Sequence, residues 1–297
     1  MRATNSVRTY LMFTTRFMTG LIVGVVLPIS NLSSPLIFSR GCEAPSVTSI
    51  NQTGSRTVQV SLDTDADVLI ENSDGKRLGF DFTTRKFVSE IPDAQSLDRE
   101  TSSIFILPYD KTGKPYKIAV SGKPASAPAA TLSITGPGFI TGVRSLKLSV
   151  GQIQKIVLSA DGSSISYVAG DDGATPQLFI TTQWGRDKPC YRFEVASSLL
   201  SPGKTIKVTL DLTGGKLYFN SDDGKKSSFE LMMRRTNPGG VRQIYNHQAV
   251  SFGRANSYVL DFAQWDGKGE ACFQEKCSGC NESQCTKLKN EYLKPKE

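Results

Sequence analysis

The chain has 297 residues and a formal net charge of +7, from 35 basic and 28 acidic residues. Four arginines (Arg2, Arg8, Arg16 and Arg40) lie in the first 41 residues, where there is no acid, so the remainder carries only three more basic than acidic residues. This balance excludes the dense basic surface of a nucleic-acid-binding protein, and the length predicts two domains rather than one.

The N-terminus has the pattern of an export signal. A positively charged segment precedes a run of 13 mainly apolar residues, 17–29, whereas a membrane-spanning helix needs about 20. Residues 1–41 are therefore predicted to be a signal peptide or a membrane anchor, with cleavage before Cys42. The only membrane attachment expected is this segment or a lipid on Cys42. The predicted location is extracellular or the cell envelope.

Residues 44–135 are predicted to form an antiparallel β-sandwich module. Short β-branched and aromatic segments are separated by turns, and no helical period competes with them. Asp74-Gly75 lies between two such segments and is a strong hairpin signal, because Gly accepts the positive φ that a primed turn requires. The expected strands are 57–62, 68–71, 78–82, 103–107, 117–120 and 131–135.

A second sandwich module is predicted over residues 139–273, followed by a short Cys-rich tail, 274–297. Gly136-Pro137-Gly138 marks the expected boundary, since Pro cannot donate to a strand ladder and Gly weakens one. The expected strands are 145–150, 155–158, 165–168, 177–181, 191–195, 205–212, 216–219, 228–233, 249–252 and 257–262. The predicted fold class is thus all-β, with two consecutive antiparallel β-sandwich modules after an N-terminal export signal.

One stretch resembles a known type of module. Residues 75–94, followed by the segments Tyr116–Val120 and Thr131–Gly136, resemble the bacterial extracellular β-sandwich (Ig-like) accessory modules that are found in secreted hydrolases, repeat proteins and adhesins. The resemblance implies an accessory or binding role and brings no catalytic residue with it. Asp93 departs from the pattern, which usually has Gly there. The matching residues are Gly75, Arg77, Gly79, Phe80, Asp81, Glu90, Ile91, Pro92 and Ala94.

All six cysteines are disulfide candidates, because an exported chain meets an oxidising environment. Four of them, spaced C-x4-C-x2-C-x4-C, are Cys272, Cys277, Cys280 and Cys285. Two local disulfides are the first interpretation of this cluster. A zinc or Fe–S site on four thiolates and a redox pair at Cys277 and Cys280 are the alternatives. Cys42 and Cys190 are expected to pair with each other. If Cys42 carries lipid instead, Cys190 pairs with a cysteine of the cluster or stays buried.

No catalytic residue is predicted. His247 is the only histidine, which excludes two-His metal sites, and no G-x-S-x-G elbow accompanies it. It is expected to be a loop residue, while chemistry by a pair of acids stays open. Asp63, Asp65 and Asp67 spell the first half of a calcium loop but lack its Gly and Glu. No metal ligand or cofactor is therefore assigned, with calcium or zinc as the alternatives considered.

The ligand-binding candidates lie around one loop: Trp184, Arg186 and Tyr191. A loop on a rigid sandwich is where binding residues gather, whereas Trp265 follows an alternating strand and is predicted to be core. The sequence thus predicts an exported, non-catalytic protein with a binding, adhesion or envelope-scaffolding role, whose partner is a cell-surface glycan or protein. The alternatives are an accessory or divergent cell-envelope hydrolase acting on glycan or protein, and a metal- or redox-linked function of the C-terminal Cys cluster.

Overall fold

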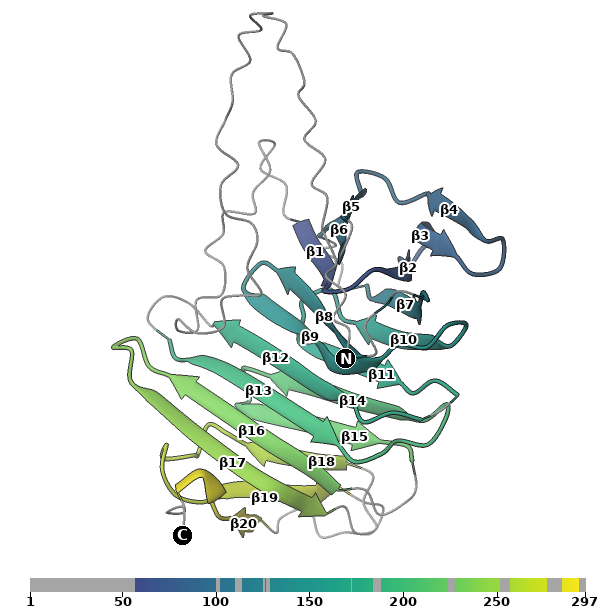
Figure 1. The fold of residues 1–297 in the computed structure, drawn as a ribbon. Coiled ribbons are helices and arrows are strands. Elements are labelled where there is room, and N and C mark those ends of the chain that lie inside the picture. The colour runs from purple at the N-terminus through teal and green to yellow at the C-terminus, as the bar shows by residue number, and fades with distance from the viewer. Residues whose placement is uncertain are drawn as a thin grey trace, which may run out of the picture. The chain divides into compact units, whose positions relative to one another are not determined.

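The computed structural model describes residues 57–99, 102–109, 114–124, 126, 129–171, 173–183, 188–223, 228–251, 257–276 and 285–293. They form two antiparallel sheets (Figure 1), which confirms the all-β prediction. The expected export signal, 1–41, and Cys42 lie outside these residues. No helix in the described part of the chain is long and apolar enough to span a membrane.

The first sheet has nine strands, each antiparallel to its neighbours. One edge strand is β17 and the other is β5. In spatial order the strands are β17 (Arg242–Ser251), β16 (Ser228–Thr236), β13 (Cys190–Ser197), β12 (Gln177–Gln183), β9 (Phe139–Lys147), β8 (Ala129–Gly136), β1 (Thr57–Leu62), β6 (Ser102–Pro108) and β5 (Gln95–Arg99).

The second sheet has eleven strands with the same antiparallel pairing. A single 3-10 turn, η1 (Glu291–Leu293), follows its last strand. In spatial order the strands are β20 (Thr286–Leu288), β19 (Ala271–Lys276), β18 (Ser257–Asp261), β15 (Lys216–Ser221), β14 (Thr205–Asp211), β11 (Ser164–Val168), β10 (Ile153–Leu158), β7 (Tyr116–Gly122), β2 (Ala66–Glu71), β3 (Arg77–Asp81) and β4 (Lys86–Ser89).

The core lies between the two sheets because apolar residues alternate with polar ones along most strands. In β14, for example, Ile206, Val208 and Leu210 are buried while the lysine and threonines between them are not. Alternate side chains point to opposite faces of a sheet, so this pattern buries one face. The buried residues of both sheets belong to one hydrophobic cluster that runs from β1 to β19.

From β8 onward, consecutive β-hairpins alternate between the two sheets. Hairpin β8–β9 enters the first sheet, β10–β11 the second, β12–β13 the first, and the alternation continues to β18–β19. The colours of Figure 1 follow this progression from teal to yellow. Each hairpin therefore pairs with the second hairpin before it in the chain, which lies in the same sheet. Consecutive hairpins consequently lie in opposite sheets.

The expected domain boundary at Gly136–Gly138 is a hairpin turn in the structure. Gly136 pairs with Phe139, and Gly138 has a φ of +84°, as the third residue of a type II turn with Pro before it requires. Both sheets continue across this point, and the described residues between 57 and 293 belong to one compact unit. The two-module layout is therefore not confirmed.

Several strands differ from the expected ones. β9 covers 139–147 rather than 145–150, with a bulge where Ser145 has a φ of +56°. β17 begins at Arg242, well before the expected 249, because Ile244 and Tyr245 are adjacent among polar residues and do not alternate as in a half-buried strand. β4, β5, β19 and β20 were not expected; they are short or partly exposed, so their side chains alternate weakly.

The outer edge of β17 is covered by side chains from the C-terminal segment. The Asn290 amide donates to the Ile244 carbonyl at 2.7 Å and accepts from the Asn246 N–H at 3.1 Å. The Gln248 N–H donates to Glu291 at 2.8 Å. These side chains occupy the backbone groups that a neighbouring strand would take, which protects the edge against pairing with another chain.

A disulfide joins Cys272 in β19 to Cys285, which directly precedes β20. Cys190 is also disulfide-bonded, whereas Cys277 and Cys280 lie outside the described residues. The disulfide interpretation of the cluster is thus confirmed for Cys272 and Cys285, whose thiols are committed to each other rather than to a four-thiolate metal site.

Replacing both Cys272 and Cys285 with serine should lower the free energy of unfolding by about 3 kcal/mol, the loop-closure entropy expected for a separation near 15 residues. The separation is 13. Urea unfolding of the two oxidised proteins measures the change. Hydrogen exchange at Asn246 and Gln248 should accelerate as well, since the disulfide anchors the segment that covers β17. An unchanged urea midpoint would contradict the prediction.

Candidate functional site

Of the three predicted ligand residues, Tyr191 lies in the described part of the chain, and it is not on an exposed loop. Trp184 and Arg186 lie outside the described residues. Tyr191 is 7% exposed and belongs to the core, with its ring stacked 5.9 Å from Phe193 and 4.8 Å from Phe262. Tyr191 and Phe193 alternate along β13 and so share its inner face. Tyr191 therefore does not offer its ring to a ligand, a correction that the alternation itself could have suggested.

The residues considered for catalysis or calcium have protein partners. His247 lies in strand β17, not in a loop, with its Nδ1 3.1 Å from the Lys289 carbonyl. Asp65 and Asp67 face the ammonium of Lys123, at 2.8 and 3.6 Å. Within the described ranges no group of three or more His, Cys, Asp or Glu side chains is placed to hold a metal ion.

The residues of the resemblance form an ion-pair network on the outer face of β3. The Arg77 guanidinium lies 2.8 Å from Asp81 and 2.9 Å from Glu90. Position 79, between Arg77 and Asp81 on the same face, is Gly with a φ of +114°, and a Cβ there would lie 2.1 Å from the Val68 carbonyl oxygen. Ile91, from the same stretch, is buried. The stretch is thus explained by local folding rather than by a ligand.

Two carboxyl groups of this network predict an acid-sensitive fold. Hydrogen bonds from the Thr83 N–H and the Thr84 hydroxyl hold the pKa of Asp81 below its usual value, and the bond from Arg77 does the same to the pKa of Glu90. A group with a depressed folded-state pKa contributes stability above its unfolded pKa and loses it as the pH falls. Stability should therefore be level near neutral pH and fall below about pH 4. The urea midpoint of unfolding, measured from pH 7 to pH 2.5, tests this prediction. In Asp81→Asn the decline of this midpoint at acidic pH should be smaller.

A groove opens where β3 leaves β2, and we call it the phenylalanine groove. Its cavity volume is about 220 Å³. Phe105 forms a buried wall, Phe80 is half-buried, and Phe87 is 53% exposed. The groove is lined by Asp65, Ala66, Asp67, Val68, Phe80, Phe87, Ser103, Phe105 and Lys123. It combines apolar walls with a few polar groups, as binding pockets do.

One side of the groove is a strand segment with no ladder partner on that side. β7 pairs with all of β2, from Ala66 to Glu71. β3 pairs with β2 only over Leu69–Glu71, and beyond Gly79 it pairs with β4 alone. Among the described residues no ladder partner lies beside Ala66–Val68 on the groove side. Backbone groups alternate between the two edges of a strand, and the Val68 carbonyl oxygen is directed at Gly79 of β3. The Ala66 N–H and C=O and the Val68 N–H are therefore the backbone groups available there.

The rim of the groove carries an excess of negative charge. Two carboxylates, Asp65 and Asp67, share one ammonium, that of Lys123. The Lys123 N–H donates to the Ser126 hydroxyl at 2.7 Å, and this hydroxyl donates to the Asp65 carbonyl, which fixes the lysine in place. The hydrogen bond to Asp65 raises the pKa of Lys123. The rim therefore remains an ordered set of charges with a net value of −1.

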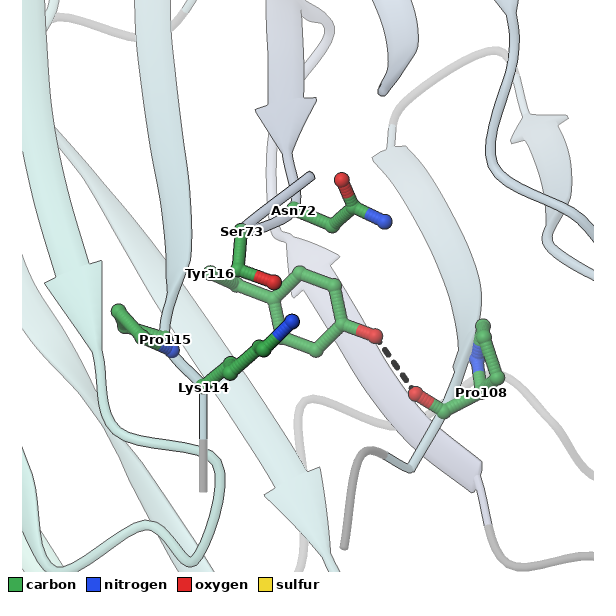
Figure 2. A pocket seen from close by; sticks show the side chains of 6 residues that line it. All are labelled: Asn72, Ser73, Pro108, Lys114, Pro115 and Tyr116. Atoms are coloured by element: carbon green, nitrogen blue, oxygen red, sulfur yellow. Dashed lines mark hydrogen bonds between the residues drawn. The ribbon is translucent and has the colours of Figure 1, made fainter. Parts of the chain in front are cut away.

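A second cleft of similar volume lies at the other end of β2, lined by Asn72, Ser73, Pro108, Lys114, Pro115 and Tyr116. Figure 2 shows the Tyr116 hydroxyl directed at the Pro108 carbonyl, to which it donates at 2.6 Å. The Asn72 amide oxygen accepts from two N–H groups of its own turn, and Lys114 pairs with Asp74. Most polar groups of this cleft thus serve the fold, which makes it the weaker candidate.

A buried ionic cluster lies on the outer face of the first sheet. Glu194 accepts from the Arg192 Nε at 2.6 Å and from Arg144 at 3.1 Å. It also accepts from the Gln177 amide at 2.7 Å. The guanidinium carbons of Arg144 and Arg192 lie 5.1 and 5.6 Å from the centre of the Phe179 ring, within cation–π range. Since each of these polar groups has a partner in the cluster, we assign it to stability.

Comparisons with protein-family models, with curated proteins and with solved structures find no match to this chain. The function therefore has to be inferred from the geometry of its own residues. The phenylalanine groove, which the sequence did not indicate, is the site with exposed apolar surface, unpaired backbone and organised charge together.

Proposed function

We propose that this chain is an exported, non-catalytic β-sandwich protein of the cell surface or envelope that binds a glycan or protein ligand. The observation that carries the proposal is the phenylalanine groove, where Phe87 stays 53% exposed beside an organised set of charges. Exposing a large aromatic side chain to water is unfavourable, and an exposed aromatic ring in a pocket is typical of a binding site.

Two further observations support the proposal. The disulfides of Cys190 and of Cys272 with Cys285 agree with folding outside the cytosol, where disulfides persist. The carboxyl groups with shifted pKa values in the described structure, Asp81, Glu90, Asp161 and Asp266, all have lowered pKa values. A carboxylic acid acting as a general acid needs a raised pKa instead.

The test uses the full-length oxidised protein on two surfaces, an array of cell-surface glycans and an array of immobilised peptides. Binding to a defined set of either kind, lost in Phe87→Ser, is expected. The matched control is Leu199→Ser, since Leu199 is 66% exposed and lies outside the groove. Binding to neither array, or binding that both variants retain, would contradict the proposal.

A further inference from the structure

On the groove side of β2, backbone N–H and C=O groups are spaced as in an extended polypeptide chain. Ala66–Val68 is fixed in an extended conformation by β7 and has no ladder partner toward β3 among the described residues. Since the Val68 carbonyl is directed at Gly79, the Ala66 backbone groups and the Val68 N–H are the ones open to a ligand. An extended chain presents donors and acceptors at the same repeat, and it can add to an open strand as a further strand. The far edge of the first sheet is different, since Asn290 and Glu291 already cover β17.

The three phenylalanines provide a place for one large side chain next to that strand. Phe80 and Phe87 face each other across the β3–β4 ladder, and Phe105 lies in the opposite sheet. The cavity of about 220 Å³ has room for one large apolar side chain. In strand addition the backbone bonds provide affinity and such a pocket provides specificity.

The charge of the rim adds a second requirement. Asp65 and Asp67 exceed the single ammonium of Lys123 by one negative charge. A Lys or Arg beside the apolar residue of the ligand would be attracted there, and an acidic residue would be repelled.

Resting on the binding role proposed above, we infer that the phenylalanine groove takes an extended peptide segment. The segment pairs its backbone with the Ala66 backbone groups and the Val68 N–H, inserts a Phe or Leu among Phe80, Phe87 and Phe105, and places a basic residue beside Asp65 and Asp67. The groove would thus select a protein ligand rather than a glycan.

The experiment measures fluorescence anisotropy with the full-length oxidised protein and labelled nine-residue peptides of Ser and Thr. The central residue is Phe, Leu or Ala, and its neighbours are Lys or Glu. Phe- and Leu-centred peptides with Lys neighbours should bind, and the Ala-centred peptide should bind at least about tenfold more weakly, as for loss of an anchor residue. Methylation of the backbone nitrogens beside the anchor should weaken binding by a similar factor, because it removes the donors of the ladder.

Variants of the protein make the test specific. Phe87→Ser should abolish binding, Leu199→Ser should leave it unchanged, and Asp67→Asn should reduce the preference for Lys over Glu. Since Phe87 is half exposed, circular dichroism should show that Phe87→Ser remains folded. The preference for Lys should also decline with rising salt, because the rim is partly exposed.

The remaining outcomes separate this inference from the proposed function. Binding to a glycan but to no peptide would overturn the peptide inference and leave the binding role standing. Equal binding of methylated and unmethylated peptides would overturn the strand pairing. Concentration-dependent dimers that Phe87→Ser abolishes, seen by sedimentation, would assign the groove to a second copy and overturn the inference as well. Binding of neither ligand class would overturn both.

Discussion

Replacing Glu194 with alanine should lower the free energy of unfolding by about 3–5 kcal/mol, the cost of removing one partner from a buried ion pair. The side chains of Glu194 and Arg192 are 6% and 7% exposed. Burial and the neighbouring Arg144 and Arg234 already lower the pKa of Arg192. An arginine nonetheless keeps its charge, so without the carboxylate this guanidinium would stay buried beside positive neighbours and lose the ion pair with Glu194.

Urea unfolding of the oxidised protein, followed by circular dichroism, measures the loss. The matched control is Glu230→Ala, because Glu230 lies on the same face one strand away, opposite Ala196, and is exposed. It should change stability by no more than about 0.5 kcal/mol. A loss below about 1 kcal/mol in Glu194→Ala, which is the value typical of an exposed ion pair, would show that water reaches the cluster.

A double variant, Arg192→Leu with Glu194→Leu, distinguishes the two physical causes. If the loss in Glu194→Ala comes from an unpaired charge, removing both charges should recover most of it, since apolar replacement of a buried pair is often neutral. If the double variant is as unstable as the single one, the packing of these side chains over Phe179 is the larger contribution.

The sandwich could be predicted from the sequence because its signals are local. β1, β2, β10 and β14 have buried apolar residues at alternate positions, and Asp74-Gly75 marks the turn between β2 and β3. The continuity across Gly136–Gly138 could not be predicted in this way. Pro-Gly is compatible with both a linker and a two-residue turn, and only the pairing of β8 with β9 distinguishes them.

The candidate site could not be predicted from the sequence for a similar reason. Phe80, Phe87 and Phe105 belong to three strands, and they meet because β3 departs from β2 after Gly79. The periodicity of apolar residues indicates which face of a strand is buried, but it does not indicate where two strands separate. Tyr191 is the opposite case, since its place next to a loop suggests an exposed ring, whereas it shares a strand face with the buried Phe193 and lies inside.

Replacing Trp265 with alanine should also cost about 3–5 kcal/mol, the usual range for a buried tryptophan. The core position predicted from the sequence is confirmed, since Trp265 is 2% exposed and its ring lies edge-on to Tyr245, 5.9 Å away. The Arg235 guanidinium covers the indole ring at 5.3 Å, and its Nη1 donates to the Trp265 carbonyl at 3.0 Å. Alanine would leave a cavity between these groups and remove the cation–π contact.

Two controls separate packing from hydrogen bonding. The buried indole N–H has no acceptor among the described residues, so Trp265→Phe loses no hydrogen bond and should retain most of the stability. Tyr292→Ala removes an aromatic ring that is 59% exposed and should change stability by no more than about 0.5 kcal/mol. Equal losses in Trp265→Phe and Trp265→Ala would contradict the packing argument.

The shape of the unfolding curve then tests how far the core is continuous. Trp265 lies in the turn after β18, while β1 and β2 belong to the same hydrophobic cluster at the other end of the sheets. If that cluster unfolds as one cooperative unit, Trp265→Ala should shift a single transition to lower urea without splitting it. Two independent modules would instead leave one transition unshifted, because the module containing β1 to β8 would not lose a contact.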